Sequence, residues 1–148
     1  MGKVSQELGQ RVYFDANIII YLVEGFTPYL DQLRALSQSL NTNEITAVTS
    51  ELTLAEVLVK PLKDQLPAIQ QAYQTFLTPT PALYVKAIDR EILEEAALLR
   101  AITKLKLPDA IHLATALRQQ CDSFLTNDAM FRTLNLSQIK ILSDLQLL

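Results

Sequence analysis

The sequence has little cysteine and little glycine, with one cysteine and three glycines among 148 residues. A single thiol, Cys121, can neither close an intramolecular disulfide nor form a cysteine-based zinc site, so we expect a protein of the reducing cytoplasm. Hydrophobic residues make up 49% of the chain and charged residues 20%, which excludes disordered and low-complexity classes. We therefore expect one globular domain spanning residues 1–148.

Long apolar runs and an excess of positive charge are also missing. The longest apolar run, Ile18 to Val23, is far shorter than the roughly 20 residues of a membrane-spanning helix, so we expect neither export nor membrane insertion. The formal net charge of −3 argues against a surface that holds nucleic acid non-specifically. That objection weakens if several acids converge on one site, because bound divalent cations would invert the local field.

Apolar runs typical of strands alternate with helical patterns along the chain. Strands are expected at Arg11 to Phe14, Glu44 to Thr49, Leu83 to Ile88, Ser123 to Thr126 and Lys140 to Leu142. Helices are expected at Asn17 to Glu24, from a Thr27 cap to Asn41, from a Ser50 cap to about Lys60, at Pro67 to about Thr78, Arg90 to about Lys104, Pro108 to about Gln120, and Ala129 to Leu134. Residues 1–10 are expected to form a polar N-terminal tail. This alternation predicts an α/β fold whose parallel sheet is covered by helices on both faces.

Four acidic residues lie in apolar surroundings at related places in this pattern: Asp15, Glu56, Asp109 and Asp128. Two of them follow strands, and two lie near the starts of helices, positions that converge at one edge of a doubly wound sheet. Each acid also has a simpler explanation. These are a helix cap for Asp15, a solvated stripe for Glu56, a favourable helix N-terminus for Asp109 and a turn for Asp128.

Four carboxylates in one place suit a hard cation. Mg²⁺ and Mn²⁺ prefer oxygen ligands and often bridge to substrate phosphates, whereas the same cluster without cations would repel itself. With one or two ions bound, such a site can lower the pKa of a water, orient it at phosphorus and stabilise the leaving oxygen. The sequence thus favours a magnesium-type nuclease site.

Four segments in order resemble the PIN domain family, and within it the VapC-type toxins: Val12 to Asn17, Thr49 to Glu56, Leu107 to Leu117 and Leu125 to Asp128. The likeness extends from Arg11 to Leu142. It implies a three-layer α/β/α fold with a parallel sheet of four or five strands, and metal-dependent ribonuclease activity on an RNA substrate. It also implies a small antitoxin that occupies the active-site groove and, commonly, a homodimer.

The resemblance also implies roles for particular residues. The catalytic and metal-binding acids would be Asp15, Glu56, Asp109 and Asp128, with the first three as the central set. The supporting polar residues would be Asn17, Thr126 and Asn127. Because all four acidic positions are filled, catalysis is favoured over the alternative of a non-catalytic PIN-like module that binds RNA or protein.

Other residues near these motifs have two interpretations each. Arg100, Lys104 and Lys106 are candidate RNA contacts at the edge of the groove, or ordinary solvated charges. His112, three residues after Asp109, is within reach of a hydrogen bond to it, although a structural role is favoured because metal chemistry needs no histidine base.

A strand-ending aspartate also serves as the nucleophile of some phosphatases and phosphoacceptor domains. The haloacid-dehalogenase type requires a second aspartate where this chain has Asn17. Receiver domains require paired acids and a late lysine that this chain lacks. Both classes are therefore disfavoured.

Overall fold

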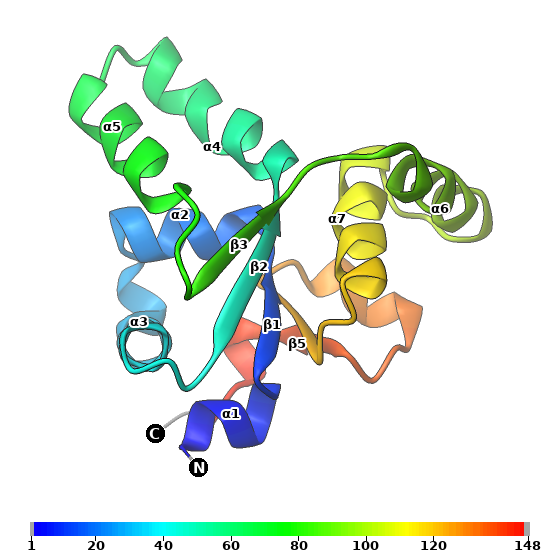
Figure 1. Ribbon diagram of the computed structural model, residues 1–148, viewed down its shortest axis with the longest axis horizontal. Coiled ribbons are helices and arrows are strands. Elements are labelled where there is room, and N and C mark those ends of the chain that lie inside the picture. Colours follow the sequence, from blue (N-terminus) through cyan, green and yellow to red (C-terminus); the bar gives the residue numbers. More distant parts are fainter. Residues whose placement is uncertain (1, 147–148) are drawn as a thin grey trace.

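A parallel sheet lies between two layers of helices in the computed structural model, which describes residues 2–146 (Figure 1). Within these residues the strands are β1 Arg11–Phe14, β2 Thr46–Ser50, β3 Leu83–Lys86, β4 Ser123–Thr126 and β5 Ile139–Ile141. They lie in the order β3-β2-β1-β4-β5, and each neighbouring pair is parallel. The α/β/α architecture is therefore confirmed, with a five-stranded sheet over the described part of the chain.

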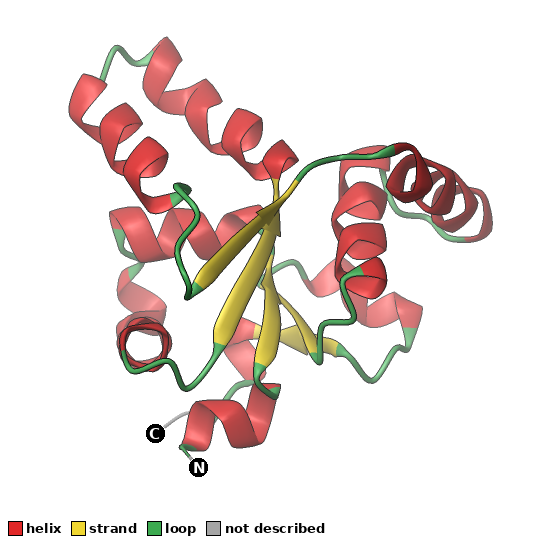
Figure 2. Cartoon of the chain, in the orientation of Figure 1, coloured by secondary structure: helices red, strands yellow, loops and turns green. Residues whose placement is uncertain are grey.

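The helices of the described residues are α1 Lys3–Leu8, α2 Ala16–Glu24, α3 Leu30–Asn41, α4 Glu51–Lys63, α5 Pro67–Phe76, α6 Arg90–Ile102 and α7 Leu107–Arg118. Short 3-10 turns are η1 Thr27–Tyr29, η2 Ala129–Leu134 and η3 Leu142–Asp144. Helices α2 to α5 cover one face of the sheet, and α6 and α7 cover the other (Figure 2). None of the helices in residues 2–146 is long and apolar enough to cross a membrane.

Strand β1 is buried on both of its faces because it runs through the centre of the sheet. Val12 and Phe14 pack into the core beneath α2 to α5, while Tyr13 packs into the core beneath α6 and α7. All three are fully inaccessible to solvent. Side chains of a strand alternate between its faces, so a continuous apolar run such as this one signals a strand covered on both sides.

Residues 2–10, the described part of the expected polar tail, are not simply a tail. They contain α1, whose Val4 and Leu8 are buried in the same core cluster as Leu142 and Leu145. The two α1 side chains are four positions apart and so lie on one helical face. Because polar residues separate these two side chains in the sequence, the helix cannot be recognised from its apolar pattern.

Two helix boundaries also differ from the sequence-based prediction. Helix α4 continues past Lys60 to Lys63 with Pro61 inside it, buried against the core. The missing N–H of Pro61 costs one bond of the last turn, and its carbonyl still accepts from the backbone of Leu66 at 2.9 Å. Thr27 begins η1 instead of capping α3, whereas Ser50 caps α4 as expected by accepting from the N–H of Leu52.

The order of the strands places a switch point at the centre of the sheet, and we call the region beyond the carboxyl ends of β1 and β4 the crevice. The chain runs outward from β1 to β2 and β3, then returns to place β4 on the other side of β1. Connections after β1 and β4 therefore leave on opposite sides, and ligands of such sheets bind beyond the carboxyl ends of the strands at this switch point.

We expect Leu8→Ala to lower the free energy of unfolding by about 2 to 3 kcal/mol, the lower part of the range for buried Leu→Ala substitutions. Leu8 is only 1% exposed, and its removal leaves a cavity between α1 and the sheet. Urea unfolding measures the change. Glu7→Ala, at an exposed position of the same helix, is the control, and equal stability of the two variants would contradict the packing of α1.

Candidate functional site

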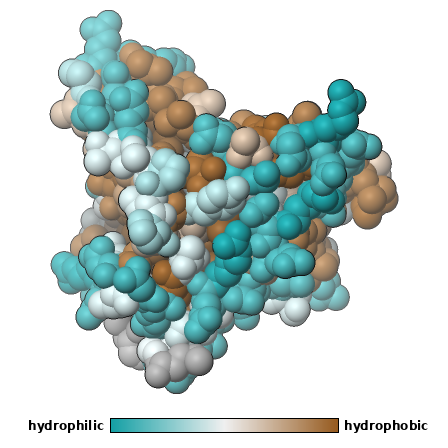
Figure 3. Space-filling model, viewed as in Figure 1, coloured by the Kyte–Doolittle hydropathy of each residue, from teal (hydrophilic) through white to brown (hydrophobic). Residues whose placement is uncertain are grey.

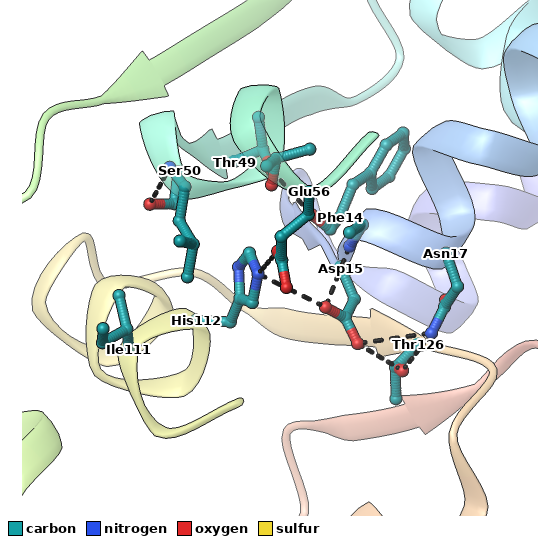
Figure 4. Close-up of polar contacts among 12 residues, drawn as sticks. Phe14, Asp15, Asn17, Thr49, Ser50, Glu56, Ile111, His112 and Thr126 are labelled. Atoms are coloured by element: carbon teal, nitrogen blue, oxygen red, sulfur yellow. Dashed lines mark hydrogen bonds and ion pairs between the residues drawn. The ribbon is translucent and has the colours of Figure 1, made fainter. Parts of the chain in front are cut away.

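Asp15 lies in the central crevice, directly after β1, with 5% of its surface exposed (Figure 4). Its Oδ1 accepts a hydrogen bond from the backbone N–H of Ala16 at 2.9 Å, which makes it the N-cap of α2. Its Oδ2 accepts from the hydroxyl of Thr126 at 2.7 Å. The capping role considered from the sequence is thus real, and it holds the carboxylate inside the crevice.

Asn17, Thr126 and Asn127 join the end of β4 to the turn after β1, as Figure 4 shows for the first two. The Asn17 side chain donates to the Thr126 hydroxyl at 3.2 Å, and its Oδ1 accepts from the backbone N–H of Asn127 at 3.0 Å. The Asn127 amide contacts the Tyr21 hydroxyl at 3.2 Å. These bonds fix the position of Asp15 relative to both strands.

Glu56 reaches the crevice from the second turn of α4, and its partner there is His112 of α7. The His112 Nε2 lies 2.5 Å from Glu56 Oε1 and 3.9 Å from Asp15 Oδ1. The Nδ1 of the same ring lies 2.6 Å from the Tyr13 hydroxyl. The hydrogen bond to Asp109 considered from the sequence is replaced by these two bonds, so His112 is part of the acidic site as well as of the core.

Asp109 and Asp128 border the same crevice from α7 and from the turn after β4. Asp109 is half-buried in the first turn of α7. The exposed Asp128 caps η2 by accepting from the N–H of Met130 at 2.9 Å, and its own N–H donates to the Thr126 hydroxyl at 3.1 Å. Asp128 is therefore a turn residue whose backbone is tied to the network around Asp15.

The charges of the four acids act on one another. Burial raises the pKa of Asp15, with His112 and the Thr126 hydroxyl opposing that change. Burial also raises the pKa of Asp109, and the charges of Asp15 and Asp128 raise it further. These effects show that the charges of Asp15, Asp109 and Asp128 act on one another, and they leave this edge of the sheet with an unfavourable concentration of negative charge.

His112 is in direct contact with this concentration of charge, through Glu56 and Asp15. Burial lowers its pKa, but the hydrogen bond to Glu56 and the charges of Asp15 and Glu56 outweigh burial, so the pKa of His112 is raised overall. When ionised, the four acids carry four negative charges, and a protonated imidazole neutralises one of them. An additional cation would relieve the remaining repulsion.

The donors of the crevice suit a hard divalent cation, since each of the four acids offers carboxylate oxygen. Over residues 2–146, however, no three acidic, histidine or cysteine side chains already stand around one point at metal-binding geometry. Ion binding would therefore require the exposed acids to turn inward toward Asp15. Asp109 and Asp128 can do so because the first is only half-buried and the second is exposed, whereas Glu56 is already held beside Asp15 by His112.

The candidate RNA contacts lie in the last turn of α6 and in the loop between α6 and α7. Arg100 donates from Nη1 to the carbonyl of Leu105 at 2.6 Å and so braces the loop before α7. Lys104 and Lys106 are exposed on that loop. Lys106 immediately precedes α7 and lies three residues before Asp109.

Comparison with known proteins identifies relatives of this fold. The family model described as the PIN domain matches residues 12–135. A toxin–antitoxin complex from Klebsiella pneumoniae contains a chain that is 27% identical, with 88% of this chain and 97% of that chain covered and a TM-score of 0.66. A sequence comparison with curated proteins gives no match.

Two further solved structures share the fold at lower identity. VapBC2 from Rickettsia felis, bound to a DNA fragment from its promoter, is 16% identical, with 89% and 98% of the two chains covered and a TM-score of 0.69. VapC20 from Mycobacterium tuberculosis, a toxin that cleaves the sarcin–ricin loop, is 13% identical, with 87% and 98% covered and a TM-score of 0.64.

We expect Asp109→Asn to stabilise the ion-free protein at pH 7.5 and to remove its response to Mn²⁺. A carboxyl whose folded-state pKa is raised contributes stability below its unfolded-state pKa and loses it as the pH rises through the folded-state pKa. The variant should therefore melt about 1 to 3 °C above the parent in EDTA, as expected for less than roughly 1 kcal/mol in a chain of this length.

Thermal melting from pH 3 to pH 8 measures this difference, which should vanish at the acidic end. Glu94→Gln, at an exposed position of α6, is the control and should melt like the parent at every pH. A variant that is less stable than the parent at pH 7.5 in EDTA would show that Asp109 is not destabilised by its neighbours.

Proposed function

The chain belongs to the PIN domain family, and from this premise we propose that it is a metal-dependent endoribonuclease and the VapC-type toxin of a type II toxin–antitoxin pair. The proposal is supported by the placement of Asp15, Glu56, Asp109 and Asp128 around the switch point of the sheet, where their charges act on one another. Mg²⁺ or Mn²⁺ is the proposed cofactor and RNA the proposed substrate.

In this proposal Asp15, Glu56 and Asp109 hold the ion and Asp128 completes the set from the turn after β4. A bound divalent ion would supply Lewis acidity, activating a water and stabilising the leaving oxygen of the phosphodiester. Both oxygens of Asp15 are held by hydrogen bonds, one from the Thr126 hydroxyl and the other from the backbone of Ala16. The expected products carry a 5′-phosphate and a 3′-hydroxyl.

The exposed cations beside α7 are proposed to contact the RNA backbone. Lys104 and Lys106 stand on the loop braced by Arg100, and this loop leads directly into the helix that carries Asp109. Lysine contacts to phosphate position a substrate without reading its sequence. Together the three residues would offset the negative field of the crevice for an approaching strand.

We expect Asp15→Asn and Asp109→Asn each to reduce RNA cleavage by at least about 100-fold, because each removes a charged ligand of the ion. Cleavage of a labelled RNA pool in Mg²⁺ and in Mn²⁺ measures the loss, with circular dichroism confirming the fold. Glu94→Gln is the matched control for loss of a carboxylate and should cleave like the parent.

Retained cleavage by purified Asp15→Asn protein, with contaminating nuclease excluded, would contradict the assignment. Thermal stabilisation by Mn²⁺ without cleavage of any RNA tested would instead identify the alternative, a non-catalytic PIN-like module that binds RNA or protein.

The proposed partner is a small antitoxin protein, as in the Klebsiella pneumoniae complex to which this chain is similar. Apolar side chains are exposed over the α4–α5 hairpin in Figure 3, and Val59, Leu62 and Leu66 on this hairpin are exposed by 55%, 56% and 43%. Glu56 lies on the same helix one turn before Val59. A partner that covers this hairpin would therefore reach the crevice.

A homodimer in the cytoplasm is the proposed state of the toxin itself.

We expect expression of the chain alone to arrest growth, and co-expression of a short open reading frame from immediately upstream to restore it. Leu62→Asp should weaken the purified complex at least tenfold, because it places a charge in the apolar contact. Leu98→Asp, at a 59% exposed position of α6, is the control. Equal loss of affinity in both variants, measured by calorimetry, would move the partner away from the hairpin.

A further inference from the structure

Glu56 has little to hold it in place apart from His112. Its side chain is one-third exposed on α4, and the hydrogen bond that the structure gives its carboxylate is the one to His112 Nε2 at 2.5 Å. A glutamate side chain loses substantial rotamer freedom when it is confined to one position. The position of the Glu56 carboxylate therefore depends on how firmly the imidazole is held.

The imidazole of His112 is held from behind by the core. Its side chain is 1% exposed, its Nδ1 lies 2.6 Å from the Tyr13 hydroxyl, and its ring meets the Tyr13 ring edge-on with centroids 5.8 Å apart. Tyr13 in turn stacks on Phe124 of β4, with centroids 5.2 Å apart and planes within 5° of parallel. The ring of His112 is thereby fixed by two central strands.

Hydrogen-bond chemistry determines which nitrogen carries the proton toward Glu56. An ionised carboxylate only accepts, so the short contact requires a hydrogen on Nε2. The Tyr13 hydroxyl can then donate to Nδ1 of a neutral ring or accept from Nδ1 of a charged one. In either case Nε2 donates to Glu56, and the same N–H lies near Asp15 Oδ1 at 3.9 Å.

This arrangement occupies one oxygen of Glu56 and leaves the other without a hydrogen-bond partner among residues 2–146. Carboxylates that ligate metals are themselves commonly hydrogen-bonded by a second layer of residues, which sets their orientation. We propose that His112 is a positioning residue, backed by Tyr13, that holds Glu56 Oε1 so that Oε2 is presented to a divalent cation shared with Asp15. The inference rests on the proposed metal-dependent function and assigns no proton-transfer step to the histidine.

The first test compares Mn²⁺ affinity of the full chain by isothermal calorimetry. His112→Ala should bind Mn²⁺ 10- to 100-fold more weakly than the parent, the usual cost of removing an outer-layer partner. His112→Gln keeps an N–H near the Nε2 position and should recover most of that loss. Leu113→Ala, the matched control, removes packing from the next residue of α7, which is 1% exposed, and should bind Mn²⁺ like the parent.

The outcomes separate this inference from the proposed function. Parent protein that binds no Mn²⁺ overturns both. Parent protein that binds, with His112→Ala equally tight, overturns the positioning role alone. Equal losses in His112→Ala, His112→Gln and Leu113→Ala also overturn it, because they would reflect packing of α7 and not the hydrogen bond.

A second measurement needs no substitution, because His112 is the only histidine in the chain. A ¹⁵N-resolved spectrum of the labelled parent protein should show a single imidazole with its proton on Nε2. That proton should remain protected from exchange when Mg²⁺ is added to saturation. An Nε2 without a proton, or loss of its signal on adding Mg²⁺, would show that Glu56 leaves His112 and would overturn the proposal.

Discussion

The burial of Asp15 at the end of the central strand is the constraint on which the rest of the site depends. A carboxylate that is 5% exposed loses most of its hydration, and burying it unpaired would be strongly unfavourable. Three elements compensate for that loss: the start of α2, the hydroxyl of Thr126 at the end of β4, and the imidazole of His112 on α7. These groups come from the turn after β1, from β4 and from α7, so the site forms only when these three elements are assembled.

The same arrangement connects the two hydrophobic cores. Tyr13 packs into the core beneath α6 and α7 through its ring, and its hydroxyl supports His112 at the boundary of the crevice. On the neighbouring strand, the Thr49 hydroxyl donates to the carbonyl of Phe14 at 2.9 Å and contacts Thr53 of α4 at 2.8 Å. Buried polar groups of this kind stabilise only when their bonds are satisfied, which favours one geometry over near alternatives. The acidic crevice is thus held by a polar layer that is continuous with the packing of the strands.

Much of the fold was accessible from the sequence because burial on two faces leaves uninterrupted apolar runs, as in Val12 to Phe14 and Phe124 to Leu125. The prediction that the four acids meet follows from the same logic, since the carboxyl ends of parallel strands share an edge. The partner of His112 did not follow, because Glu56 is 56 positions away and Tyr13 is 99 positions away, and no local pattern records such contacts. Helix α1 was missed for a different reason: two buried side chains, Val4 and Leu8, are too few to produce a clear helical period.

The net charge of −3 looks unfavourable for a protein that acts on RNA, but its distribution changes that reading. The sixteen acidic residues exceed the thirteen lysines and arginines by three, which is fewer than the four acids proposed for the crevice. Outside the crevice the chain therefore carries slightly more basic than acidic side chains. Because salt screens charges beyond about 10 Å, a substrate responds to the local field and not to the total. Ion occupancy of the crevice, more than the composition of the whole chain, would then decide whether a phosphate backbone is attracted to this edge of the sheet.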